Sequence, residues 1–143
     1  MTITFLKSKS DIPLIHFRIP GHSKQYTALV DSGSEITLIN NKFIEESGLE
    51  PEVNGMMNVQ GIDGKTNIKT GRYHFHIAFN KYSMKEKFFE VYAISTDLSG
   101  LAAQFNHQYD EGLVFDMIIG SDFLSVNKAD IDYNNKVITI NNK

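Results

Sequence analysis

The sequence has no cysteine, no long apolar run and no cluster of basic side chains. The lack of cysteine excludes disulfides, thiolate metal ligands and cysteine nucleophiles. Its longest apolar runs are a few residues long, whereas a membrane-spanning helix needs about 20. Fourteen basic against seventeen acidic residues give a net charge of −3, with no patch suited to phosphates. We therefore expect neither a membrane nor a nucleic acid as a partner.

What remains is typical of a globular protein. The chain has 143 residues, 41% of them hydrophobic and 22% charged, which predicts one domain over residues 1–143 with a single core. Charged residues interrupt the first 17 residues, so they lack the continuous apolar stretch of a secretory signal. We expect a mature, cytoplasmic protein.

Strands dominate the predicted secondary structure. Short runs rich in β-branched and aromatic residues alternate at a period of two, which indicates an all-β fold. Pro20 and Gly21 predict a turn that joins the first two strands as a hairpin. The clearest strands are expected at residues 12–19, 26–30, 68–79, 88–94 and 137–140.

One or two short helices interrupt this pattern. The first should begin at Asn40 or Asn41, whose side chain could cap it, and end at Gly48, which suits a left-handed stop. The second should begin just after Gly120. Residues 95–111 show no sustained period, and we expect them to form an irregular insertion.

The residues with the clearest chemical meaning are Asp31, Ser32, Gly33 and Ser34, which separate two apolar runs. Such a turn delivers a carboxylate from inside a core. The hydroxyls can hold the turn, and Gly33 permits a backbone geometry that a Cβ would forbid. We expect the Asp31 carboxylate to be fixed and partly desolvated. An ordinary surface turn, in which Asp31 bonds its own backbone, is the alternative for the tripeptide alone.

A second segment near the chain end matches the first, because Ile118 and Ile119 run directly into Gly120. Two apolar residues before Asp-Ser-Gly, with two later apolar residues before Gly, resemble the retropepsin-like aspartic protease family, which includes retroviral proteases and the protease-like domain of Ddi1. The resemblance covers about residues 13–140. It has no counterpart for the 95–111 insertion, and Ser34 stands where relatives often have alanine.

The resemblance implies a closed acid-protease β-barrel with a catalytic role for Asp31. Ser32 matches the position whose hydroxyl reaches the partner's turn, and Gly33 matches the position whose backbone lies against the substrate. Structural support of the site would come from Ser34, Ile118, Ile119 and Gly120.

The same family closes a β-hairpin flap over its substrate, which here corresponds to residues 57–72. Its tip, with expected substrate contacts, would be Gly61, Ile62, Asp63 and Gly64. Asp63-Gly64 also favours an ordinary hairpin turn, and the two interpretations are compatible.

The chain has one such turn, whereas peptide hydrolysis by this chemistry needs two carboxyls that share a proton. We therefore predict a homodimer in which two Asp31 carboxylates activate a water. Residues 2–7 or 136–143 could supply interface strands. The expected function is an aspartic endopeptidase that needs no cofactor. The alternatives are a dimeric peptide-binding or assembly module with little catalysis, and a monomer whose turn is only structural.

Other chemistries are less well supported. The Gly-x-Ser-x-Gly elbow of serine hydrolases is absent. His74 and His76 would share one face of a strand, a spacing that metal ligands use, but no third ligand is evident nearby. We therefore expect no metal site.

Overall fold

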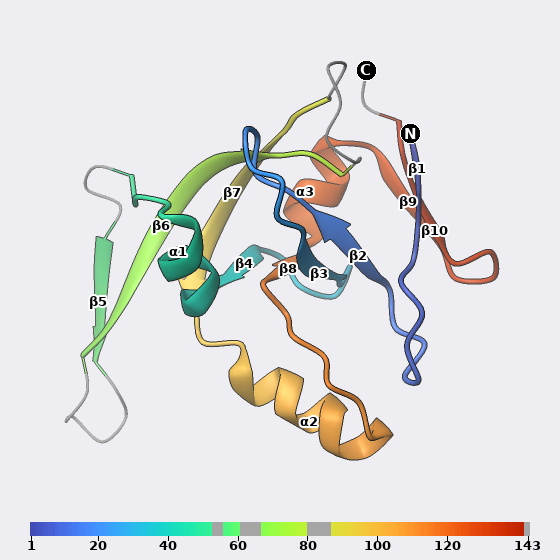
Figure 1. Ribbon diagram of the computed structural model, residues 1–143. Coiled ribbons are helices and arrows are strands. Elements are labelled where there is room, and N and C mark those ends of the chain that lie inside the picture. Colours follow the sequence, from blue (N-terminus) through green and yellow to red (C-terminus); the bar gives the residue numbers. More distant parts are fainter. Residues whose placement is uncertain (53–55, 61–66, 80–86, 142–143) are drawn as a thin grey trace.

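The computed structural model describes residues 1–52, 56–60, 67–79 and 87–141 (Figure 1). Strands predominate, as the sequence predicts, and the described residues contain three short helices where one or two were expected. The strands are β1 (Thr2–Thr4), β2 (Leu14–Phe17), β3 (Tyr26–Val30), β4 (Thr37–Asn40), β5 (Met56–Gln60), β6 (Asn67–Ile77), β7 (Phe89–Thr96), β8 (Met117–Ile119), β9 (Ala129–Asp132) and β10 (Val137–Ile140); the helices are α1 (Asn41–Ser47), α2 (Ser99–Tyr109) and α3 (Ser121–Val126).

Two sheets organise the described residues. The larger has the strand order β2-β3-β8-β4-β7-β6-β5, and the smaller has the order β1-β10-β9. The larger sheet is mixed, because β3 pairs with β8 and β4 pairs with β7 in parallel, while its other pairs are antiparallel. The predicted hairpin of β2 and β3 is confirmed.

The expectation of a closed barrel is wrong for the described strands, which form two open sheets. The larger sheet curls until Arg18, just after β2, exchanges two backbone hydrogen bonds of 2.8 and 2.9 Å with Ala78, just after β6. This contact is an isolated bridge rather than a ladder. Pro20 follows two residues later and has no N–H with which to extend the pairing.

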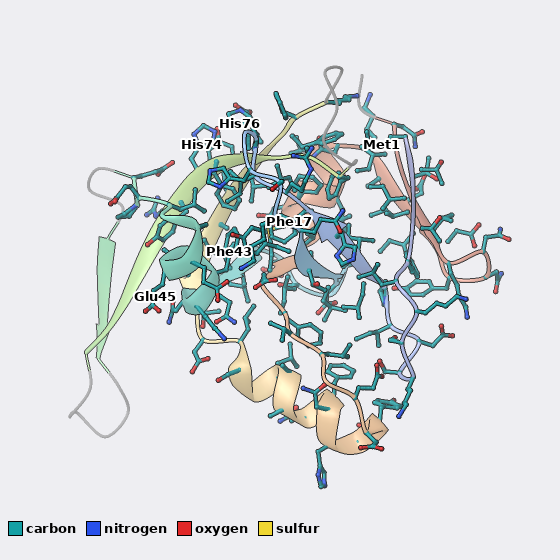
Figure 2. All side chains as sticks on the ribbon, in the orientation of Figure 1. Met1, Phe17, Phe43, Glu45, His74 and His76 are labelled. Carbon is teal, nitrogen blue, oxygen red and sulfur yellow. The ribbon has the colours of Figure 1, made fainter. Side chains whose placement is uncertain are left out.

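Alternation along the strands builds the main core. Tyr73, Phe75 and Ile77 of β6 are buried, whereas the residues between them face outward. Phe17 of β2 and Phe43 of α1 meet edge to face, with ring centroids 5.5 Å apart, near the centre of the molecule (Figure 2). The position of α1 is therefore fixed by aromatic packing against the sheet.

The ends of α1 agree only partly with the prediction. Gly48 ends the helix with a φ of 73°, and its N–H donates to the Ile44 carbonyl, which confirms the left-handed stop. Asn40 precedes the helix, but its side chain does not cap it. Its amide group donates instead to the Phe115 carbonyl and accepts from the Leu98 N–H, so it ties together two buried loop segments.

The predicted irregular insertion is wrong, because residues 95–111 contain the end of β7 and the whole of α2. Leu98, Leu101, Ala102 and Phe105 pack with Phe115 in a second, smaller core. This core also includes Leu14, Leu29 and Ile118 of the larger sheet, so it lies between that sheet and α2, which Figure 1 shows as a separate layer. The partial burial of that apolar stripe stabilises the helix. None of the described helices is long and apolar enough to cross a membrane.

Candidate active site

The Asp31 turn begins where β3 ends, between β2 and β8. Val30 of β3 lies opposite Ile119 of β8, and its N–H donates to the Pro13 carbonyl at 2.9 Å. The Asp31 N–H then donates to the Ile119 carbonyl, also at 2.9 Å. The backbone that carries the carboxylate is thus held from two sides at the edge of a buried strand.

Short hydrogen bonds define the turn itself. The Gly33 N–H donates to Asp31 Oδ1 at 2.9 Å, and the Ser34 N–H donates to the Asp31 carbonyl at 3.1 Å. The Ser34 hydroxyl donates to the Ile36 carbonyl at 2.7 Å. The Ser34 hydroxyl therefore ties the turn to the backbone two residues later, and Asp31 also bonds its own backbone, as in an ordinary Asx turn.

The exposure of the turn differs from the prediction. Asp31, Ser32 and Gly33 are exposed in the single chain, whereas we expected partial desolvation of the carboxylate. The reason is geometric, since the turn projects past the end of β3 into solvent. The Gly33 N–H anchors one carboxylate oxygen of Asp31, and the residue is accessible to solvent.

Gly120 lies directly beneath the turn. A Cβ at this position would come within 2.5 Å of the Ile36 carbonyl oxygen and 2.7 Å of the Ser34 carbonyl oxygen. The next residue, Ser121, donates its N–H to that Ser34 carbonyl at 2.7 Å. The structure therefore brings Gly120 and Ile119 into contact with the turn, and only a residue without a side chain fits at position 120.

Thr37 and Asp122 connect the two halves of this site, and the sequence reasoning missed their contact. The carboxylate of Asp122 accepts the Thr37 hydroxyl at 2.7 Å, the Thr37 N–H at 3.1 Å and the Phe123 N–H at 2.8 Å. The Thr37 oxygen in turn accepts the Gly120 N–H at 3.1 Å. Thr37 is only 1% exposed. An aspartate in the first turn of a helix after Gly120 was the available signal.

Ser32 faces away from this network. Together with Ser121, Tyr133 and Asn141, it lines a hollow beside α3 and β9. No hydrogen bond of its hydroxyl is found within the described part of the chain. The hydroxyl is therefore positioned at the surface next to the three-stranded sheet.

The expected flap, residues 57–72, includes most of β5 and the first part of β6. β5 and β6 pair antiparallel from Met56 opposite Gly71 to Gln60 opposite Asn67. The expected tip, Gly61, Ile62, Asp63 and Gly64, lies outside the described residues, so its contact with substrate stays a prediction.

A pocket lies between the end of the Asp31 turn, at Ile36, and the β6–β7 pair. Its volume is about 420 Å³, within the range of small-ligand sites. Ile36 and Ile94 supply apolar walls, while Arg72, Glu52 and Asp122 supply charged ones.

Asp116 precedes β8, at the end of that strand opposite Gly120, and its pKa is raised. Burial raises its pKa, and the hydrogen bond from the Thr27 N–H to its carboxylate, 2.9 Å long, opposes that effect. The Asp116 N–H also donates to the Thr27 carbonyl at 2.9 Å. These two hydrogen bonds between Asp116 and Thr27 set the register of β8 relative to β3.

Comparisons with known proteins agree with this geometry. The family described as aspartyl protease matches residues 15–123. The retroviral protease-like domain of Ddi1 from Leishmania major is 20% identical, with a TM-score of 0.55 over 92% of this chain and 90% of that one.

A retropepsin-like aspartic protease from Rickettsia conorii is 11% identical, with a TM-score of 0.54 over 96% of this chain and 86% of that one. A comparison with curated protein sequences found no match. The family match spans most of the chain, and both structures share its mostly-β fold. The chain belongs to the aspartyl protease family and has a retropepsin-like fold.

Proposed function

We propose that the protein is a homodimeric aspartic endopeptidase in which Asp31 of each copy contributes one catalytic carboxyl. The observation that carries this proposal is the Asp31 turn. Its backbone is hydrogen-bonded to β8, and it packs so closely on position 120 that only glycine fits there. Its Asp31 side chain is nevertheless exposed. A turn with only a structural role would not require an exposed carboxylate on a backbone that is held in this way.

Two such carboxyls at close range cannot both ionise comfortably, so they share one proton. The ionised carboxylate takes a proton from water while the water oxygen bonds to the peptide carbonyl carbon. The protonated carboxyl gives its proton to the carbonyl oxygen. Collapse of the tetrahedral intermediate breaks the C–N bond: the carboxyl that is now protonated gives its proton to the leaving amine, and one hydroxyl of the intermediate returns a proton to the ionised carboxylate.

A single chain supplies only half of this arrangement. A two-fold axis through the exposed turns would bring the two Asp31 carboxyls together and desolvate them. Ser32 would then reach the partner's turn, and the backbone of Gly33 would lie along the substrate. The exposure of all three residues in one copy supports this interpretation.

The smaller sheet narrows the choice of interface strands. β10 pairs with β1 on one edge and with β9 on the other within a single copy. A strand from residues 136–143 would therefore have to displace a neighbour before it could pair with a second copy. We propose that β1, an outer strand of that sheet, forms the interface.

The substrate would be an extended peptide lying between the paired turns and the two flaps, with backbone hydrogen bonds for affinity and side-chain pockets for selectivity. The pocket lined by Ile36 and Ile94 would take one substrate side chain. Residues Gly61, Ile62, Asp63 and Gly64 would cover the peptide from above.

The test is digestion of a peptide library, from acidic to neutral pH, by the wild-type chain and by Asp31→Asn. Asp110→Asn is the matched control, because Asp110 is exposed at the end of α2 in a left-handed conformation that asparagine also tolerates. We expect cleavage by the wild type and the control and none by Asp31→Asn. Equal cleavage by Asp31→Asn would overturn the proposal, and peptide binding without cleavage by any variant would favour a binding module.

A further inference from the structure

The outward face of the β6–β7 pair carries a cluster that the aspartic protease chemistry does not use. His74 and His76 lie two residues apart on β6, so both side chains project from one face. On β7, Glu90 lies opposite His76, and Tyr92 lies opposite His74. Figure 2 shows both imidazole rings on the outer side of β6, away from the core around Phe43.

The structure places Glu90 next to both histidines, as a candidate for the third ligand that the sequence left unidentified. Its Oε1 lies 3.5 Å from His74 Nε2 and 3.8 Å from His76 Nε2. One ligand atom from each of the three side chains lies within 4.8 Å of the others. Ligands bound at about 2.0–2.1 Å in a tetrahedral zinc site are about 3.4 Å apart. Small rotations of the side chains would bring the three atoms to that spacing.

We propose that His74, His76 and Glu90 bind one divalent transition-metal ion of the zinc type, which joins β6 to β7. Two imidazoles and one carboxylate are a ligand set that zinc uses, with a remaining position for water or a further ligand. Imidazole ligands suit Zn²⁺, Ni²⁺ and Cu²⁺, whereas Ca²⁺ and Mg²⁺ prefer oxygen ligands. The imidazole donors therefore favour a transition-metal ion over Ca²⁺ or Mg²⁺.

The surroundings of the cluster support this assignment. The side chains of His74, His76 and Glu90 are 35, 49 and 58% exposed, so an ion can reach all three. Tyr92 stacks on the His74 ring at 4.3 Å with an interplanar angle of 6°, which holds that imidazole in orientation. Beneath the ligands, Val91 is buried in the core, so the strands that present them are fixed.

Direct pairing of the histidines with Glu90 would also account for the distances without a metal, and metal titration separates the two explanations. The full chain, freed of metal by a chelator, is titrated with Zn²⁺ by calorimetry, with Mg²⁺ as the negative control. We expect one Zn²⁺ per chain and no binding of Mg²⁺. Co²⁺ should give the visible absorption of a low-coordinate nitrogen and oxygen site.

Single substitutions identify the ligands. His74→Ala, His76→Ala and Glu90→Gln should each weaken Zn²⁺ binding by about tenfold or more, at least as much as the loss of an outer-shell partner. His22→Ala and His107→Ala are matched controls, since both histidines lie outside β6 and β7, and their Zn²⁺ affinity should equal that of the wild type. Circular dichroism checks that each variant is folded.

Asp31→Asn should bind Zn²⁺ like the wild type, so this test is independent of the proposed peptidase activity. The proposal would be overturned if the wild type bound no Zn²⁺, or if His74→Ala and Glu90→Gln bound it as tightly as the wild type.

Discussion

The Asp31 turn and the outer face of β6 and β7 both present chemically active side chains to solvent, but their supports differ. The turn rests on backbone contacts with β8 and on Gly120, whose N–H is held in turn by the Thr37 hydroxyl. The His74 cluster rests on strand register alone, with its contacts made between exposed side chains. The Asp31 turn is supported by buried groups, whereas the His74 cluster lies on the exposed face of the larger sheet.

This difference predicts how each site couples to folding. Substitutions under the turn should change both stability and the geometry of Asp31, since the supporting groups are buried. Substitutions on the outer face should remove a ligand and leave the fold unchanged. Unfolding measurements on single variants at one fixed protein concentration can test that contrast, because the stability of a dimer depends on concentration.

The largest effect is expected for Gly120→Ala. A methyl group within 2.7 Å of two backbone carbonyls forces the turn and β8 apart, which should cost about 3 kcal/mol or more in the free energy of unfolding. Urea unfolding measures this loss. Gly112→Ala is the control, because a Cβ there meets nothing within 4 Å. Equal stability of the two variants would show that the turn does not rest on Gly120.

Thr37→Val should have the next largest effect. The substitution keeps the shape but removes the hydroxyl that donates to Asp122 and accepts from the Gly120 N–H. A buried donor and a carboxylate lose a partner, which should lower the free energy of unfolding by about 1–3 kcal/mol.

Thr96→Val at the half-exposed end of β7 is the matched control and should be nearly neutral. If Thr37→Val were as stable as this control, the hydrogen bonds of Thr37 would not be what joins the two halves of the site.

Asp116→Asn should change how stability depends on pH. Burial raises the pKa of Asp116 in the folded chain, so the folded state binds this proton more tightly than the unfolded state. The stabilisation by the proton is present at low pH and is lost as pH rises from the ordinary aspartate pKa through the raised one.

Asparagine stays neutral and can still accept from Thr27. The free energy of unfolding of the wild type minus that of Asp116→Asn should therefore fall as pH rises across that window. Urea titrations at several pH values measure it, with Asp110→Asn as the exposed control. A difference that stays constant or rises with pH would contradict the burial of Asp116.

The smallest effect is expected on the outer face. Without metal, His74→Ala and Glu90→Gln should change the free energy of unfolding by no more than about 0.5 kcal/mol, since exposed ion pairs contribute little. A loss close to that of Thr37→Val would show that this face also supports the fold, and the contrast between the two regions would disappear.

Local sequence signals predicted the parts of the molecule that depend on local chemistry. Gly48 ends α1 in the left-handed conformation. The position of Gly120 under the turn was expected from the family resemblance and not from a local signal. The stripe of Leu98, Leu101, Ala102 and Phe105 has helical spacing and could have predicted α2, but it is short and interrupted by polar residues.

Long-range pairing could not be predicted. The parallel alignment of β3 with β8 joins residues about 90 positions apart, and no local pattern specifies it. Glu90 comes next to His76 only through the register of β6 and β7. For the same reason the contact between Thr37 and Asp122 was missed. The closed barrel was expected from the family resemblance and not from the residues themselves.

The central claim is that two Asp31 carboxyls from two copies form one catalytic centre, and mixing tests it most directly. A fixed amount of wild-type chain is equilibrated with increasing Asp31→Asn chain under conditions where sedimentation shows dimers, and peptide cleavage is measured. If both carboxyls are needed, a ninefold excess of the variant should reduce cleavage to about one tenth, since few wild-type pairs remain. Cleavage that stays constant throughout would show that each Asp31 acts alone and would contradict the account.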